Sequence, residues 1–420
     1  MRIVFVLECT NSINNGTGAT CYRFAEELRK KGHDIVMLGE ELKPGQTSQF
    51  AYYGLKHYKF PIFEGLIIKD GFNFVYSDPK TIYEAIKGAD LVHLFIPFKL
   101  CSVARLIAES LGVPTSCAFH MQAENITSAL RLGKVKFLND ILYFSFRRYL
   151  YAHVRHCHCP SEMIKRQLEA HHYPNVFHVI SNGITPFFHR IDVQKPAEVA
   201  DRIVVTMAGR LANEKRQDLI IKAVAKSKYN EKIQIVFCGK GPSKKRYIKL
   251  CNRVGIAHLP VFHFCQQEQL RKILSYTDIY VHASDFEIEG ISAIEAIACG
   301  AVPIISDSKY SATSSFSLDD HCLFRHGSVS SLMERIEWFI EHPEERQRLS
   351  KAYEEEGKEY HLEKMVTKTE EMFEAAIADF KAGLDPVQNR IRKKDVRKKR
   401  KLYKRLIAAG VVDDMPEDLR

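Results

Sequence analysis

Short runs of apolar residues alternate with amphipathic stretches along the first half of the chain. Apolar residues at successive positions suit strands that are covered on both faces. The runs predict strands at residues 2–7, 34–38, 91–95, 115–119, 156–159 and 177–180. The first amphipathic stretch predicts a helix from about residue 19 to 31, after a polar, glycine-containing loop at 10–18 and ending before Gly32. Strands that alternate with helices in this way indicate a parallel sheet with helices on both faces.

The same alternation begins again in the second half. It predicts strands at 203–208, 233–238, 279–282 and 302–306, and helices at 218–226, 244–254 and 291–298. We therefore expect an α/β protein with two Rossmann-like, doubly wound domains facing each other across a cleft. The predicted parts are an N-terminal domain (1–186), a linker (187–200), a C-terminal domain (201–360), a helix returning to the N-terminal domain (361–382) and a tail (383–420). Ligands of such sheets bind beyond the carboxyl ends of the strands.

The positive charge of the chain is concentrated in the tail. The formal net charge is +10, and between residues 390 and 405 eleven Lys and Arg residues accompany a single acid, Asp395. Such a segment attracts a polyanion, either an anionic membrane surface or nucleic acid. The predicted contact residues are Arg392, Lys393, Lys394, Arg397, Lys398, Lys399, Arg400 and Lys401. The tail has a helix-forming composition but too little apolar surface to form a core.

Composition narrows the class of protein further. Apolar residues make up 45% of the chain, enough for two cores, and no window is long and apolar enough to span a bilayer. The opening apolar run is too short for a signal peptide and is interrupted by Glu8. The eleven cysteines are scattered without paired spacing, which favours a reducing cytoplasm. The sequence His-Cys-His-Cys at 156–159 falls on a predicted strand, so its side chains would alternate between faces, and we predict no metal site.

Two glutamates mark the start of a helix in the second domain. Glu287 and Glu295 are separated by seven residues, with Gly290 between them where a loop turns into the predicted helix. A helix N-terminus has free N–H groups and a positive dipole end, which suit a diphosphate. Glu295 would then accept hydrogen bonds from a ribose, and Glu287 would face a sugar. The alternative is that acidic residues merely favour a helix start electrostatically.

Two other strand ends in this domain carry candidate binding residues. Arg210 and Lys215 follow strand 203–208, where two cations can neutralise a pyrophosphate leaving group; alternatively, they are solvated surface residues. Gly239 and Gly241 follow strand 233–238 and would let a flat base lie against the backbone, although a Gly-Pro turn explains them equally well.

Taken together, these motifs resemble a known family. The E-x7-E motif in EIEGISAIEAIACG, preceded by GRLANEK, is similar to the large retaining glycosyltransferase family 4, which has the GT-B fold, and the resemblance covers residues 1 to about 380. It implies that Arg210 and Lys215 bind the diphosphate of a nucleotide-sugar donor, with backbone at Gly290, Ile291 and Ser292. It also implies that Glu295 binds the ribose and Glu287 the donor sugar. The resemblance places His120 near the donor sugar at the reaction centre, and Gly16 and Gly18 in a loop over the donor phosphates.

We expect no metal or other cofactor, because Arg210, Lys215 and helix dipoles could stabilise the departing diphosphate. The family resemblance also implies that the anomeric configuration is retained. Three positions depart from the family pattern. Glu289 stands where an aromatic residue is common, residues 182–185 read Asn-Gly-Ile-Thr, and the first loop has Gly-Thr-Gly in place of a glycine pair.

The stretch HMQAEN at 120–125 indicates the acceptor, because it is similar to bacterial diacylglycerol glucosyltransferases. Residues 129–154 mix aromatic and basic residues, as at a membrane interface, or form an ordinary helix packed on the sheet. We expect a cytoplasmic enzyme, peripheral on the inner face of the cell membrane, that moves glucose from UDP-glucose to a lipid such as diacylglycerol. One alternative is a polysaccharide, cell-wall or undecaprenyl-linked glycan acceptor. A more remote one is a nucleic-acid-binding protein on a degenerate transferase fold; we expect no specific nucleic-acid partner.

Overall fold

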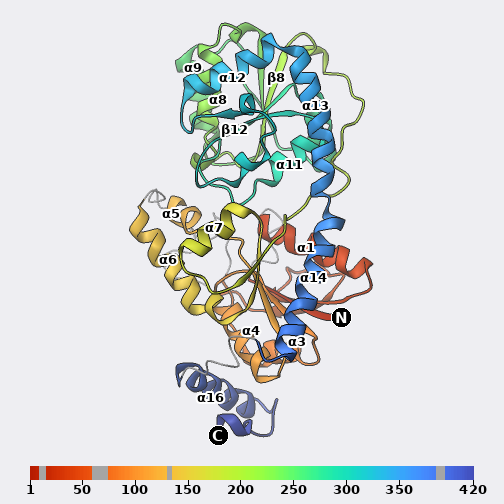
Figure 1. Ribbon diagram of the computed structural model, residues 1–420, viewed down its shortest axis with the longest axis vertical. Coiled ribbons are helices and arrows are strands. Elements are labelled where there is room, and N and C mark those ends of the chain that lie inside the picture. The colour runs from red at the N-terminus through yellow and green to blue at the C-terminus, as the bar shows by residue number, and fades with distance from the viewer. Residues whose placement is uncertain (9–15, 59–73, 130–134, 385–392) are drawn as a thin grey trace. The chain divides into compact units, whose positions relative to one another are not determined.

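The computed structural model describes residues 1–8, 16–58, 74–129, 135–384 and 393–420 (Figure 1). The chain forms two compact units, which we describe separately. The N-terminal unit contains Met1–Ile180 and Val366–Arg420, and the C-terminal unit contains Ser181–Met365. The boundary falls within helix α14 (Leu362–Lys381), most of which therefore belongs to the N-terminal unit.

The N-terminal unit is built on a parallel sheet of seven strands in the order β3-β2-β1-β4-β5-β6-β7. The strands are β1 (Arg2–Leu7), β2 (Asp34–Glu40), β3 (Ala51–Leu55), β4 (Leu91–Leu94), β5 (Thr115–Ala118), β6 (His156–Cys159) and β7 (Val176–Val179). Residues 3–7 of β1 are all buried, because this central strand is covered on both faces. β3 is an edge strand that the hydrophobic pattern did not indicate, since most of its residues are only partly buried.

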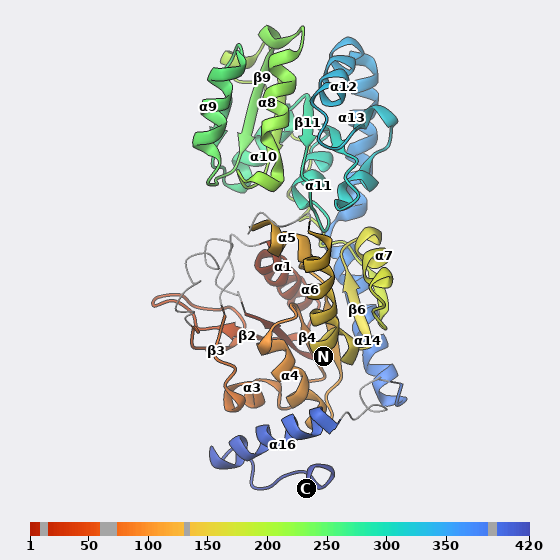
Figure 2. The same cartoon turned by 90° about the vertical axis from the view of Figure 1, so that its left-hand side faces the viewer.

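Helices cover both faces of this sheet (Figure 2). They are α1 (Gly16–Lys30), α3 (Pro79–Ile86), α4 (Lys99–Ser110), α5 (Ala123–Ala129), α6 (Lys136–Tyr149) and α7 (Glu162–Ala170). The prediction of a loop up to residue 18 is wrong at its end, because α1 already begins at Gly16. Gly18 is buried on the same helical face as Cys21, Ala25 and Leu28, so the apolar stripe extends one turn further towards the N-terminus than the sequence indicated.

The C-terminal unit has a second parallel sheet, of six strands in the order β10-β9-β8-β11-β12-β13. The strands are β8 (Ile203–Ala208), β9 (Ile233–Cys238), β10 (Val261–His263), β11 (Ile279–His282), β12 (Val302–Ser306) and β13 (Leu323–Phe324). The helices are α8 (Gln217–Lys226), α9 (Lys244–Val254), α10 (Gln267–Tyr276), α11 (Ile291–Ala298), α12 (Val329–Glu341) and α13 (Pro343–Gly357). The predicted strands β8, β9, β11 and β12 and the predicted helices α9 and α11 are confirmed at both ends. The prediction of two Rossmann-like, parallel-sheet domains is therefore confirmed.

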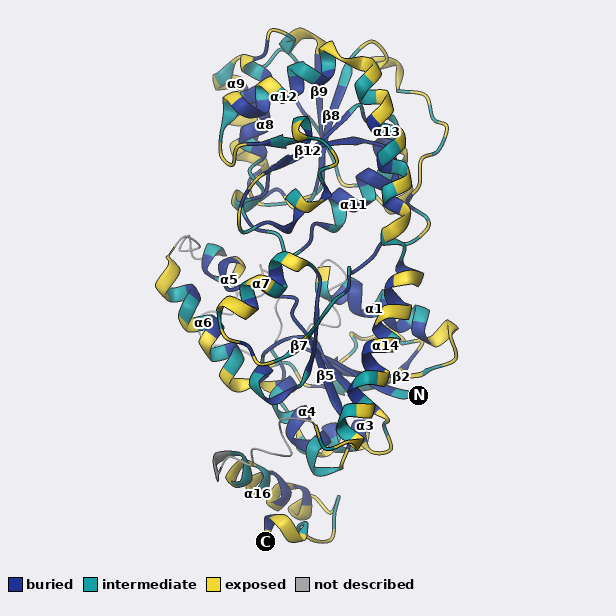
Figure 3. Ribbon diagram, viewed as in Figure 1, coloured by how far each residue is buried: buried dark blue, intermediate teal, exposed yellow. Residues whose placement is uncertain are grey.

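The basic tail is more ordered than its composition indicated. It forms helix α16 (Lys393–Ala408), which packs against α3 and α4 of the N-terminal unit. Leu402, Tyr403 and Leu406 are buried, so three apolar residues at helical spacing are enough to dock the helix on an existing surface. Figure 3 shows that α16 has both buried and exposed positions. The expectation of too little apolar surface holds for an independent core but not for docking.

Charged groups hold the first half of α16 in place. Asp395 lies 3.6 Å from His153 and 3.9 Å from the buried Arg105, and Lys399 lies 3.0 Å from Glu109. The only acid of the basic segment therefore faces the body of the unit. No helix among the described residues is long and apolar enough to cross a membrane.

Candidate active site

A cluster of three ionisable side chains lies at the carboxyl edge of the C-terminal sheet. The Glu287 carboxylate forms an ion pair with Lys215 and lies 3.0 Å from Nε2 of His282, the last residue of β11. Burial alone would raise the pKa of Glu287, but the charge of Lys215 and the hydrogen bond from His282 outweigh it and hold the pKa well below its usual range. Glu287 is therefore an ionised acceptor at neutral pH, which is the state needed to bind sugar hydroxyl groups.

Backbone contacts fix the loop that carries Glu287. Its N–H donates to the carbonyl of Tyr310 (3.2 Å), and its own carbonyl accepts from Ala312 (2.9 Å). At the start of the loop, Asp285 donates its N–H to the carbonyl of Glu214 (2.7 Å). Because Glu214 adjoins Lys215, this bond ties the two candidate loops together and holds the ion pair in register.

Gly290 closes this loop and caps α11. Its φ is +95°, and an added Cβ would collide with Cγ2 of Thr313. Only glycine satisfies both the left-handed backbone and this close packing. Ile291 and Ser292 occupy the first turn of α11. The backbone N–H groups of a first turn have no carbonyl acceptor within the helix. The geometry therefore fits the anion-binding helix start that the sequence predicted, and Glu295 is partly buried one turn further along.

The second predicted pair of loops is packed backbone against backbone. A Cβ on Gly239 would collide with the carbonyl of Gly209, and one on Gly241 with Leu211. Leu211 donates its N–H to the carbonyl of Lys240 at 2.9 Å. The two glycines thus let the loops after β8 and β9 approach each other, a role that the sequence prediction of a base-binding surface did not foresee. Arg210, on the first of these loops, is exposed.

Glu289, the residue that departs from the family pattern, has a structural partner. Its buried carboxylate accepts the backbone N–H of Asn182 at 3.0 and 3.1 Å to its two oxygens. This contact ties the segment after β7 to the loop of Glu287. A carboxylate that accepts two such bonds from one N–H suits this position, whereas an aromatic ring cannot accept them.

His120 lies at the carboxyl edge of the N-terminal sheet, just after β5. It is 6% exposed, its ring stacks on Phe95 with centroids 5.6 Å apart, and it meets His158 edge to face at 5.3 Å. Its Nε2 has no hydrogen-bond partner among the described residues. Burial, and then the neighbouring His158 and His93, hold its pKa well below the usual value. A neutral imidazole with one free nitrogen is suited to binding a hydroxyl group.

Glu8 is a second buried group at this edge, which the sequence prediction did not single out as a site residue. It directly follows β1, and one oxygen accepts the N–H of Leu100 at 2.7 Å, while the other has no partner among the described residues. Burial raises its pKa to about 8, although the hydrogen bond from Leu100 and the charge of Lys99 act against this. Near neutral pH this side chain is mainly a protonated acid.

Other predicted residues lie apart from these clusters. Gly16 and Gly18 lie in the first turn of α1, and residues 10–15 of their predicted loop lie outside the described residues. On β6, His156 lies 2.9 Å from His178 and 3.2 Å from Asp379, while His158 donates to the carbonyl of Ile180. These histidines thus have partners within the fold.

The predicted polyanion-binding residues differ in exposure and in their contacts within the fold. Arg397, Lys398 and Lys401 are exposed on α16. Lys399 is paired with Glu109, and the exposed Arg400 donates to the carbonyls of Leu419 and Arg420, so these two residues also hold the tail together. Lys393 and Lys394 open the helix, and Arg392 lies outside the described residues.

The sequence prediction did not foresee that His282 contacts Glu287 or that Glu289 accepts from Asn182. A usable clue existed for His282, because it is a polar residue at the carboxyl end of a predicted strand, five residues before Glu287. For Glu289 there was no such clue, since its partner Asn182 is 107 residues away.

Known proteins share both halves of this architecture. Residues 14–186 match the family model "Glycosyltransferase Family 4", and residues 189–356 match "Glycosyl transferases group 1". The chain is 23% identical over 321 residues to a GDP-mannose-dependent alpha-mannosyltransferase of Mycolicibacterium smegmatis, covering 73% of this chain and 79% of that protein. It is 20% identical over 231 residues to the alpha-monoglucosyldiacylglycerol synthase of Acholeplasma laidlawii, covering 51% of this chain and 58% of that protein.

Among solved structures, the sucrose-phosphate synthase of Thermosynechococcus elongatus matches with a TM-score of 0.72 at 15% identity, covering 90% of this chain and 99% of that one. This likeness shows the shared fold. Since the two family models describe the two sheet-based units in turn, the chain is a glycosyltransferase of the family 4 type with the GT-B fold.

Proposed function

We propose that this enzyme transfers glucose from UDP-glucose to a membrane lipid such as diacylglycerol, with retention of the anomeric configuration. The observation that carries the lipid acceptor is the outward face of α6. Phe137, Ile141 and Phe144 lie on one side of this helix and are 72, 45 and 52% exposed. The opposite side, with Asn139, Tyr143 and Phe146, is buried. A helix packed on a sheet needs only one apolar face, so the second one is available for a membrane.

Basic residues frame this apolar stripe. Lys136 and Arg148 are exposed at the two ends of α6, and the exposed cations of α16 belong to the same unit. Apolar side chains inserted among acyl chains and cations near phosphate groups are the two features of an interfacial helix. Glu124, in the stretch that resembles diacylglycerol glucosyltransferases, accepts the hydroxyl of Tyr143 at 2.6 Å and thereby anchors α6 to α5.

The donor is bound by the C-terminal unit in this proposal. Arg210, Lys215 and the start of α11 neutralise the diphosphate, so no metal is required. The acceptor oxygen attacks the anomeric carbon while the bond from that carbon to the diphosphate oxygen breaks. The acceptor proton passes to the departing diphosphate. Glu287 binds donor sugar hydroxyls, which requires its carboxylate to be shared between Lys215 and the sugar, and His120 binds a hydroxyl at the reacting centre.

Two relatives support the choice of substrates at different levels. The Acholeplasma protein is named for a glucosylated diacylglycerol, which supports both glucose and the lipid acceptor. The Mycolicibacterium protein is named for GDP-mannose, so GDP-mannose is the donor to compare with UDP-glucose in the experiment.

The decisive experiment measures transfer of radiolabelled glucose from UDP-glucose into the organic phase, using phosphatidylglycerol vesicles that contain diacylglycerol. The variant Phe137→Ser with Phe144→Ser should lose most vesicle binding and lipid product but retain the slow hydrolysis of UDP-glucose. The matched control replaces two exposed apolar residues of the C-terminal unit, Leu259→Ser with Leu318→Ser, and should behave like the parent protein.

Three results would contradict the proposal. Lipid product that is unchanged in the α6 variant would exclude this face as the membrane contact. Transfer only to a water-soluble glycan would replace the lipid acceptor by a glycan. Turnover of GDP-mannose but not of UDP-glucose would change the donor.

A further inference from the structure

A basic groove runs between α8 and α9 of the C-terminal unit, and the three residues of the Glu287 cluster do not line it. Its volume is about 610 Å³, and most of its lining residues are basic. The charged members are Arg216, Asp218, Lys222, Arg246, Lys249 and Arg253. The sequence prediction assigned the net positive charge of the chain to the tail, so this concentration of charge in the C-terminal unit is a feature of the folded chain.

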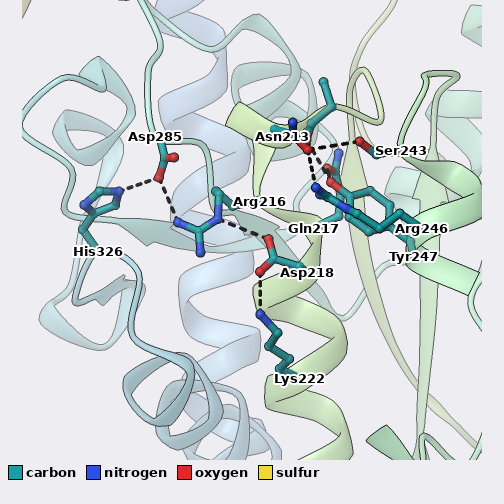
Figure 4. Close-up of polar contacts among 11 residues, drawn as sticks. Asn213, Arg216, Gln217, Asp218, Lys222, Ser243, Arg246, Tyr247, Asp285 and His326 are labelled. Carbon is teal, nitrogen blue, oxygen red and sulfur yellow. Dashed lines mark hydrogen bonds and ion pairs between the residues drawn. The ribbon is translucent and has the colours of Figure 1, made fainter. Parts of the chain in front are cut away.

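One acid neutralises only the α8 side of the groove. Asp218 lies 3.2 Å from Nε of Arg216 and 2.8 Å from Nζ of Lys222 (Figure 4). On the α9 side, Arg246, Lys249 and Arg253 follow one another at helical spacing. None of these three has a carboxylate partner among the described residues; Arg246 instead donates to the side-chain oxygen of Asn213. The α9 wall is therefore a row of uncompensated positive charges.

The walls of the groove are fixed by buried polar contacts. Tyr247, between the cations of α9, is fully buried, and its hydroxyl lies 2.9 Å from the carbonyl oxygen of Ala212 and 2.8 Å from the side-chain oxygen of Gln217, two acceptors for its single proton. Gln217 in turn donates to the carbonyl of Arg210 (2.9 Å). These bonds hold α9 against the start of α8, so the two helices that carry the cations keep their positions without a ligand.

Arg216 is also held in place, at the mouth of the groove. It has a φ of +56°, and its guanidinium contacts Asp285 at 3.2 Å, which also lies 2.6 Å from His326 (Figure 4). A side chain fixed between two carboxylates marks one end of the groove and leaves the α9 cations as the groups that can meet an anion.

We infer that this groove binds the headgroup of an anionic phospholipid, an inference that rests on the proposed membrane function. Arginine side chains pair with phosphate oxygens through two N–H groups, and the groove is large enough for one phosphodiester headgroup. None of the described residues that line the groove is aromatic, and Tyr247 of α9 is buried, so this lining offers no ring on which a nucleic-acid base could stack.

The test compares binding of the full chain to vesicles of phosphatidylglycerol and phosphatidylcholine with binding to vesicles of phosphatidylcholine alone. The groove variant is Arg246→Glu, Lys249→Glu and Arg253→Glu. The matched control has the same change in charge at three other exposed lysines of the C-terminal unit, Lys232→Glu, Lys272→Glu and Lys351→Glu. Each Lys or Arg near an anionic surface is worth a factor of about five in partitioning. We expect the groove variant to bind anionic vesicles roughly 100-fold more weakly, and the control to bind them only a few-fold more weakly.

The outcomes separate this inference from the function on which it rests. Equal weakening in both variants would overturn it, because only net charge would then matter. Unchanged vesicle binding by the groove variant would also overturn it. So would a groove variant that loses binding to an RNA oligonucleotide while its vesicle binding is unchanged. Transfer to diacylglycerol in neutral detergent micelles should be the same in the groove variant and the parent. If neither makes lipid product in micelles while anionic vesicle binding still depends on the groove, the proposed function fails and the groove stands. The fluorescence of Trp338, the single tryptophan of the chain, verifies that the C-terminal unit is folded.

Discussion

The carboxyl edges of the two sheets have the same backbone arrangement, but the ionisable groups are uncharged at one edge and charged at the other. In the N-terminal unit, burial keeps the groups at or near this edge uncharged: it lowers the pKa of His120 and His93, lowers that of His158 to about 4, and raises that of Glu8 to about 8. In the C-terminal unit, the corresponding edge holds charged pairs, Lys215 with Glu287 and Arg216 with Asp285.

The difference follows from whether each buried group has a charged partner. A buried group that lacks one is neutralised by desolvation, whereas a partner of opposite charge keeps the ionised form. The charged edge suits a diphosphate and the neutral edge suits hydroxyl groups. The same fold can therefore supply the two kinds of binding that transfer from a nucleotide sugar requires.

The largest effect is expected when the charged edge loses its carboxylate. Glu287→Gln keeps the size of the side chain but removes the charge that pairs with Lys215 and is proposed to bind the donor sugar. We expect kcat/KM for UDP-glucose turnover to fall by about 10²- to 10³-fold, as for the loss of one well-placed group at a reacting centre. Glu334→Gln, at an exposed position of α12, is the control. Activity within threefold of the parent would show that Glu287 has no such role.

At the neutral edge, His120→Ala should lower kcat by about 10²-fold, because it removes the free Nε2. His120→Gln places an amide near that nitrogen and should recover part of the activity. Both variants are compared by steady-state kinetics, with thermal unfolding as the test of folding. Equal activity in Ala, Gln and parent proteins would mean that His120 is only a packed core residue.

The charged edge also depends on a rigid backbone, which two glycines of the C-terminal unit can test. Gly290 and Gly327 both have positive φ, +95° and +74°, but an added Cβ has free space only at Gly327. Alanine at positive φ costs about 1 kcal/mol. We expect Gly327→Ala to destabilise the unit by about that amount and Gly290→Ala by about 2–3 kcal/mol, because overpacking against Thr313 adds to the strain. Denaturant unfolding followed by Trp338 fluorescence measures both, and equal losses would contradict the packing argument.

The last prediction concerns Glu8 and the pH dependence of folding stability. Its folded pKa of about 8 lies above the ordinary value of 4.5, so between these values the folded state holds a proton that the unfolded state has released. Stability should therefore be fully present below pH 4.5 and fall as pH rises towards 8, by up to about 1.4 kcal/mol per pH unit. Glu8→Gln should remove this dependence and be more stable than the parent at pH 8, with a smaller difference at pH 5.

Calorimetry at the two pH values measures the effect of Glu8, with Glu84→Gln on the exposed surface of α3 as the control. A Glu8→Gln variant whose stability depends on pH as the parent's does would show that Glu8 is ionised in the folded protein.

Most strands were predictable because their apolar runs are local properties of the chain. Strands β1, β6, β8, β9, β11 and β12 were predicted at both ends. Strands β3, β10 and β13 were not predicted, since they are short or edge strands with at most one buried residue each and a weak pattern. The start of α1 was misplaced because glycines at its first turn are typical of loops.

In the candidate site, too, some features were predictable from the sequence and others were not. Sequence spacing determined that Gly290 stands at a strand-to-helix junction and that Glu287 and Glu295 flank it, because one short segment contains all three. Only the tertiary structure decided that Lys215 and His282 meet at Glu287, that Glu289 holds Asn182, and that the α9 cations line a groove. Such contacts depend on which strands become neighbours and which helical faces they bury, and the free energy of that choice is spread over the whole core.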